Sequence, residues 1–212
     1  MDLLHILAAY LAVIIYLIGF VPYIYHVYHG RVIPHPYSWT VWAILSMIST
    51  IWLISTLGLD TSSISPIIRT LCLCIWGCIW WYFIQKIKIN IFDYVCLSLG
   101  IAIIYIAFHF SLAQAIIPMI CVDLLILTPT LKKIWNDPRS EDSLAWITTA
   151  LSQIFLLLSL EKYTFDIVVF WVYIMLVNAS VAAYILLRVH YLDRWRVRVW
   201  RFFSAIVSRG KM

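Results

Sequence analysis

The stretches "VPYIYHVYHGRVIPHPYSWTVWA" (residues 21–43) and "TPTLKKIWNDPRSEDSLAWITTA" (residues 128–150) decide the fold. When the chain is shifted along itself to superpose them, Pro22 aligns with Pro129 and Trp39 with Trp146. In both copies the proline lies near the end of an apolar run, and a polar turn follows it. Because many transporters are built from duplicated helical units, this recurrence predicts an internal repeat.

The apolar runs around the two copies are long enough to cross a bilayer. The chain has 212 residues, of which 64% are hydrophobic and only 12% charged, too little polar surface to cover a soluble core. A transmembrane helix needs about 20 predominantly apolar residues. We expect seven such spans, near residues 3–28, 37–57, 62–85, 91–108, 111–131, 144–160 and 165–187.

The spans and the repeat together predict an all-α membrane protein whose seven helices are arranged as 3+1+3. An odd linker span before the second copy gives both copies the same orientation in the membrane. The expected units are a first triple-helix bundle (1–88), a linker helix (89–109), a second triple-helix bundle (110–188) and a basic tail (189–212).

The placement of charge predicts the orientation. Residues 1–187 carry eight Lys/Arg and nine Asp/Glu, whereas residues 188–212 carry seven Lys/Arg and one Asp. With seven spans, the basic loops and the tail fall on one side, and cytoplasmic segments are the ones that collect Lys and Arg. We therefore expect a multi-pass plasma-membrane protein with its N-terminus outside and its C-terminus in the cytoplasm.

The basic tail has an amphipathic pattern. Leu192, Trp195 and Val199 recur at three- and four-residue spacing, and Arg194 and Arg198 lie on another face. This pattern is typical of an interfacial helix that binds anionic lipid headgroups. Because the membrane surface explains these basic residues, no nucleic-acid partner is expected.

Charged groups inside apolar spans are expensive and therefore mark candidate functional sites. Arg69 lies about 12 Å into the third span and Asp123 about 18 Å into the fifth, at the rise of an α-helix. Both enter from the same side, so we predict a pair that acts as a gate or as an anchor for a charged substrate. The alternatives are that Arg69 extends outward to the interface and that Asp123 is neutral and hydrogen-bonded.

Other residues complete a predicted pocket. Gln153 and Asn178 could add polar groups to it, and Trp42 an aromatic wall. Pro22 and Pro129 each remove a helix hydrogen bond and kink their spans. We interpret the two prolines as hinges for rocking motions of the bundles, the alternative being static kinks.

The two motifs carry a family resemblance. "PHPYSW" (Pro34–Trp39) and "PTLKKIWNDPRSE" (Pro129–Glu141), within the 3+1+3 frame, resemble a group of uncharacterised bacterial membrane proteins related to the SWEET and PQ-loop transporters. The resemblance covers the chain up to its tail. It implies alternating access between two triple-helix bundles, with a substrate-facing asparagine in the third helix of each. Asn178 matches that asparagine, whereas Leu71 stands at the corresponding position of the first copy.

Other functions have less support in the sequence. PQ-loop proteins place glutamine where this chain has Tyr23 and Thr130, so a non-transporting sensor, receptor or scaffold of the same fold remains the alternative. Catalytic motifs such as HExxH and GxSxG are missing, and no enzyme activity is expected.

No cofactor or metal is expected either. The histidines at positions 26, 29 and 35 are interpreted as interfacial residues rather than metal ligands, and the five cysteines as small apolar residues.

The repeat, the buried charges and the resemblance together predict a transporter of a small polar solute. The resemblance leaves a homo-oligomer open.

Overall fold

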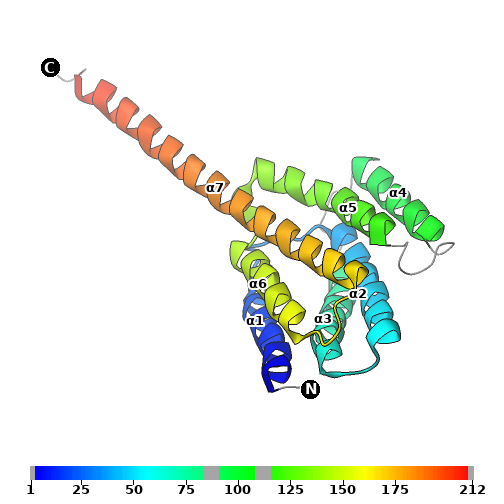
Figure 1. The fold of residues 1–212 in the computed structure, drawn as a ribbon. Helices are drawn as coiled ribbons and strands as arrows, with labels where there is room; N and C mark the ends of the chain where they lie inside the picture. The colour runs from blue at the N-terminus through cyan, green and yellow to red at the C-terminus, as the bar shows by residue number, and fades with distance from the viewer. Residues whose placement is uncertain (1–2, 84–90, 108–115, 210–212) are drawn as a thin grey trace.

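The structure, a computed structural model, describes residues 3–83, 91–107 and 116–209 and is entirely helical over these ranges apart from the connecting turns, as expected (Figure 1). The helices in chain order are α1 (Leu3–Tyr28), α2 (Pro36–Leu57), η1 (Thr61–Ser63), α3 (Ile64–Phe83), α4 (Ile91–Ala107), α5 (Ile116–Asn136), η3 (Pro138–Ser140), α6 (Ser143–Ser159) and α7 (Phe165–Arg209). The loop cations Lys86 and Lys88, and the ends of the predicted linker segment 89–109, lie outside the described residues.

Local sequence signals set the helix boundaries. Gly30, at a φ of 68°, follows the end of α1, and Gly58, at a φ of 90°, caps α2. Positive φ favours glycine because it has no Cβ. Asp60 forms a capping box with Ser63 ahead of α3, and the Asp142 carboxylate accepts the Leu144 N–H at the start of α6.

Three of the described helices are long and apolar enough to cross a membrane: residues Leu3–Tyr28, Tyr37–Leu57 and Ile167–Tyr191. Ser143–Ser159 is a shorter apolar helix. Large apolar side chains cover the outer surface; Ile14, Ile75, Ile117 and Leu176 each expose more than half of their surface. Soluble monomers rarely expose extended apolar patches, so these helices fit association with a membrane.

The helices pack in a definite set of pairs. Helix α1 contacts α3 and α6, helix α2 contacts α3 and α5, and helix α7 contacts α5 and α6. Helix α4 lies mainly against α5, at the periphery (Figure 1). The six helices other than α4 therefore surround a common centre.

Three hydrophobic clusters fill the interior. One joins α1 to α3 through Tyr16, Phe20, Tyr23 and Trp76, and Trp39 of α2 packs against it. A second joins α5, α6 and α7, and its buried members are Leu127, Ile134, Trp146, Val181, Ala182 and Ile185. The third and largest draws residues from α1, α2, α5, α6 and α7 and fills the space between the other two.

Helix α7 extends well past the predicted end of the last span. It runs without a break to Arg209, about 68 Å at helical rise, and projects away from the other helices (Figure 1). The basic tail predicted from residue 189 continues the same helix as far as Arg209. The physical reason is that residues 165–209 contain neither glycine nor proline to interrupt the hydrogen-bond ladder.

Candidate functional site

A cavity of about 120 Å³ lies among α1, α2, α3, α5, α6 and α7. Eight of its twenty lining residues are aromatic: Tyr16, Phe20, Tyr23, Trp39, Trp42, Trp146, Phe170 and Trp171. The polar side chains that line it are Ser46, Ser49, Arg69, Asp123, Thr149 and Asn178. A mostly apolar, concave site with a few polar groups is the usual form of a small-molecule site.

Four of the five residues predicted for a binding or gating site meet in this cavity: Trp42, Arg69, Asp123 and Asn178. They come from four different helices, α2, α3, α5 and α7. The structure therefore brings together residues that are far apart in the sequence.

Asp123 is the buried carboxylate of the cavity, with 7% of its surface exposed. The Tyr173 hydroxyl on α7 donates a hydrogen bond of 2.6 Å to its Oδ2 atom. Asn178 is nearly as buried, and its Nδ2 donates to the Ile174 carbonyl one turn earlier at 2.7 Å. Asn178 thus keeps its side-chain oxygen for another partner.

Arg69 does not form the direct ion pair with Asp123 that the sequence suggested. No contact within 4.0 Å joins these two described side chains. The guanidinium instead lies over the Tyr16 ring, 5.7 Å from its centroid. Its Nη1 atom is buried and has no hydrogen-bond acceptor. Arg69 therefore packs against Tyr16 of α1 rather than pairing with Asp123 of α5.

Trp42 belongs to a row of rings that crosses the site. Trp76 of α3, Trp39 and Trp42 of α2, and Trp146 of α6 follow one another in edge-to-face contacts, with centroids 5.8 to 5.9 Å apart. Such contacts fix ring orientation in addition to burying area. The row connects α3 to α6 through α2 along one side of the cavity.

Gln153 is the predicted site residue that does not line the cavity. It is buried, and its Nε2 donates to the Thr149 carbonyl at 3.2 Å and to the Ser152 hydroxyl at 3.1 Å. These bonds within α6 turn the amide back along its own helix. In the predicted repeat Gln153 aligns with Ser46, but this alignment does not predict which way the Gln153 side chain points.

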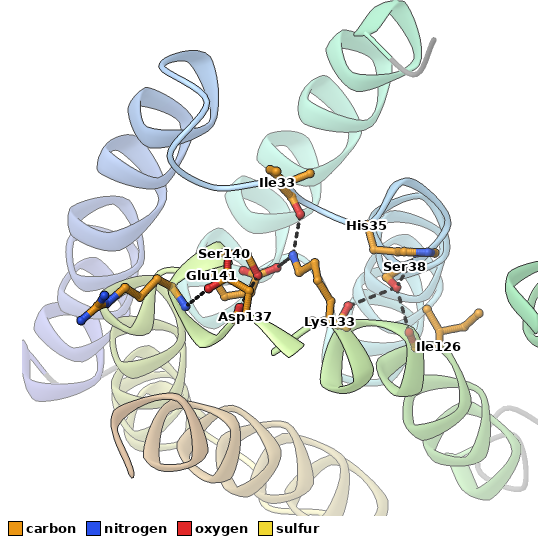
Figure 2. Close-up of polar contacts among 10 residues, drawn as sticks. Ile33, His35, Ser38, Ile126, Lys133, Asp137, Ser140 and Glu141 are labelled. Carbon is orange, nitrogen blue, oxygen red and sulfur yellow. Dashed lines mark hydrogen bonds and ion pairs between the residues drawn. The ribbon is translucent and has the colours of Figure 1, made fainter. Parts of the chain in front are cut away.

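The predicted hinge residue Pro129 lies inside α5 and leaves backbone carbonyls in need of partners. The Thr128 hydroxyl donates to the Leu125 carbonyl at 2.5 Å, which is the carbonyl that loses its N–H partner at Pro129. The Ser38 hydroxyl of α2 donates to the next carbonyl, that of Ile126, at 2.8 Å (Figure 2). A contact with a different helix therefore satisfies a backbone carbonyl in the turn before Pro129.

Ser38 was not among the predicted site residues. It is fully buried, and besides donating to Ile126 it accepts a bond from the Thr130 hydroxyl at 3.3 Å. One signal could have found it. A kinked transmembrane helix needs hydroxyl or water partners for its freed carbonyls, and Ser38 lies within the quoted "PHPYSW" motif.

In the corresponding region near Pro22, α1 contacts α6 by close packing. Gly19 of α1 lies so near α6 that a Cβ built on it would be 1.8 Å from Thr148 Oγ1 and 3.1 Å from Ala145 Cα. Only glycine fits this crossing without displacing α6. Under the shift that aligns Pro22 with Pro129, Gly19 aligns with Ile126 and Ser38 with Ala145. The two crossings therefore occupy corresponding positions in the predicted repeat.

Polar contacts join the helices at the end where α1 and α5 finish and α2 and α6 begin, the predicted cytoplasmic end. His26 Nδ1 lies 2.7 Å from Asp142 Oδ2 and links α1 to the start of α6. Lys133 of α5 binds the Glu141 carboxylate and also donates to the Ile33 carbonyl in the first turn (Figure 2). The Ile33 N–H donates to the Ser140 carbonyl at 3.2 Å. The two polar turns are thus bonded to each other.

The histidines of this end do not converge. His29 contacts the Tyr25 carbonyl, and His35 lies 3.3 Å from the Ser38 hydroxyl, while His26 pairs with Asp142. Within the described ranges, no three side chains of His, Cys, Asp or Glu gather as metal ligands would. These histidines act in the structure as hydrogen-bonding groups at the turn.

Comparison with protein-family models, with curated proteins and with solved structures finds no match for this chain.

Proposed function

We propose that this protein is a plasma-membrane carrier that moves a small polar solute by alternating access between two triple-helix bundles. In this proposal all seven long helices cross the membrane as 3+1+3, with α1–α3 and α5–α7 as the two bundles and α4 as the linker. The N-terminus lies outside, and the basic tail lies in the cytoplasm next to anionic lipid. The observation that carries the proposal is the central cavity, which both helix sets line.

The helix contacts support two equivalent bundles. The pairs α1 with α3 and α2 with α3 have counterparts in α5 with α7 and α6 with α7. The crossing of α1 with α6 has its counterpart in the crossing of α5 with α2. Each bundle has a hydrophobic cluster of its own, and a third cluster fills the seam. This is the packing expected of a duplicated unit.

The cavity itself follows the repeat. Four pairs of its lining residues align under the shift that superposes the two prolines: Tyr16 and Asp123, Phe20 and Leu127, Trp39 and Trp146, and Trp42 and Thr149. Equivalent positions of two like-oriented units therefore face one another across the seam. In transporters built from repeats, the substrate site lies at that interface.

The two proline regions supply the flexible points of the mechanism. Pro22 and Pro129 each lie close in sequence to a place where one bundle crosses the other, at Gly19 and at Ile126. A bend at either proline would change how α1 meets α6 or how α5 meets α2. We propose that these bends open and close the predicted cytoplasmic end, where polar contacts join the two bundles.

Sided cysteine labelling tests alternating access without knowledge of the solute. The five native cysteines are first replaced by alanine, and Thr149→Cys then places one thiol on the cavity wall. A membrane-impermeant maleimide is applied to right-side-out and to inside-out vesicles. A carrier should be labelled from both sides, because the cavity opens to each side in turn.

Leu151→Cys is the matched control, because this residue is on the same helix and is 43% exposed on the outer surface of the protein. A lipid-covered thiol there should resist the reagent from either side. Labelling of Thr149→Cys from one side alone would contradict the carrier and favour a receptor with a cavity of fixed access.

A further inference from the structure

We propose that the solute is a small zwitterion whose carboxylate binds Arg69 and whose ammonium group binds Asp123. This inference rests on the proposed function, because it takes the central cavity as the substrate site. It adds the chemical class of the ligand and the role of each charged residue.

The first argument is electrostatic. A charged group within the membrane is expensive unless it is paired or hydrated, and this cavity carries one of each sign. Arg69 and Asp123 do not pair with each other within 4.0 Å. A ligand with a single charge would compensate one residue and leave the other without a counter-ion. A ligand with both charges compensates both.

The second argument concerns the hydrogen bonds that each residue still lacks. Arg69 has a buried Nη1 without an acceptor, and Trp171, also on the cavity wall, has a buried Nε1 without one. Buried donors without acceptors cost free energy, and a carboxylate supplies acceptors for both. Asp123 accepts the Tyr173 bond through Oδ2, and the Trp42 side chain also hydrogen-bonds its carboxylate. A carboxylate has about four lone-pair sites, so Asp123 can still accept an ammonium N–H.

The third argument concerns size and the nature of the walls. An apolar cavity of about 150 Å³ holds benzene, so the 120 Å³ here suits a solute of roughly five to nine non-hydrogen atoms. The faces of Trp42 and Trp146 can pack on an apolar body and also attract an ammonium group. A sugar would need several hydrogen bonds around its ring, whereas these walls are mostly apolar.

Three probes of matched shape test the ligand class: valine, isobutylamine and isovalerate. Isobutylamine lacks the carboxylate of valine, and isovalerate lacks its ammonium group. Binding to the purified full-length protein is measured by calorimetry and by quenching of tryptophan fluorescence, since several tryptophans line the site. We expect valine to bind at least about tenfold more tightly than either analogue, because each charge-assisted contact adds to the affinity. Equal binding of the three, tighter binding of glucose, or no binding of valine at millimolar concentration would overturn the inference.

Two variants assign the charges. Arg69→Gln should reduce valine binding toward the level of isobutylamine, while isobutylamine binds at least as tightly as before because no uncompensated cation is left in the cavity. Asp123→Asn should reduce valine binding toward the level of isovalerate, while isovalerate binds at least as tightly as before for the corresponding reason. Binding of the retained probe shows in each case that the variant is folded. Loss of valine binding with no such pattern would contradict the assignment.

Exchange of labelled valine in proteoliposomes separates this inference from the proposed function. Binding without exchange would support the ligand class and contradict the carrier. Exchange of a neutral solute, without valine binding, would support the carrier and contradict the ligand class.

Discussion

Removal of the Ser38 hydroxyl should favour opening at the predicted cytoplasmic end. Ser38 on α2 donates to the Ile126 carbonyl of α5 and accepts a bond from Thr130, so Ser38→Ala breaks two contacts between the proposed bundles. Hydrogen bonds between transmembrane helices contribute about 0.6 kcal/mol on average and about 1.7 kcal/mol at most. The two together therefore contribute about 1 kcal/mol.

If these bonds form only in the state that is closed at this end, the variant raises the ratio of open to closed protein about fivefold. The assay is the rate at which the Thr149→Cys thiol reacts from the predicted cytoplasmic face. That rate is proportional to the open population while this population is small. Reaction from the opposite face should not increase.

Thr50→Val is the control for this prediction, because it also removes one buried hydroxyl from α2. Thr50 bonds to Thr70 at 2.8 Å and to the Pro66 carbonyl at 3.3 Å, and both partners belong to α3 in the same bundle. Its loss should lower the free energy of unfolding by a similar amount without changing the labelling rate. If both variants accelerate labelling equally, or if Ser38→Ala leaves the rate unchanged, Ser38 does not hold the two bundles together.

Two further predictions follow from packing and charge. Gly19→Ala should lower the free energy of unfolding by about 1–3 kcal/mol because the new methyl group overlaps α6. The control is Gly77→Ala on α3, which should not lower it because no atom lies within 4 Å of a Cβ built there. Equal melting temperatures of the two variants in detergent would contradict the close crossing. A peptide of residues 189–212 should bind vesicles rich in phosphatidylserine. It should lose most of that binding in concentrated salt, because its attraction to anionic lipid is electrostatic. Equal binding to neutral vesicles would contradict this role of the tail.

The sequence predicted the helices well because their limits are local. Helix α1 occupies the predicted range 3–28, and α2 begins one residue before the predicted 37. These limits depend on a few neighbouring residues: an apolar run of sufficient length, and the proline, glycine or aspartate that bounds it. Helix α7 continues past residue 187, the predicted end of the last span, because the end of a membrane span is not in itself a helix terminator.

Contacts between distant segments were harder to predict. Helical rise predicted similar depths for Arg69 and Asp123, and the family resemblance predicted that Asn178 faces the substrate. The structure brings these three residues to one cavity. Side-chain direction did not follow from the repeat, and Gln153 bonds within its own helix. The contact of Ser38 with a carbonyl 88 residues away depends on how α2 crosses α5, which hydropathy does not encode.

The two corresponding crossings, α1 with α6 and α5 with α2, are held by different kinds of contact. Under the carrier proposal, this difference predicts that one crossing changes more than the other when the cavity opens. At the α1–α6 crossing, Gly19 lies against Ala145 and Thr148 with no space for a methyl group, and close packing of this kind is lost as soon as the helices separate. At the α5–α2 crossing, Ser38 and Thr130 make hydrogen bonds, which water entering an open cavity can replace at small net cost. A crossing whose contacts can be exchanged for water opens more readily than one held by packing. In the proposed cycle the bend at Pro129 therefore changes the α5–α2 crossing more readily than the bend at Pro22 changes the α1–α6 crossing.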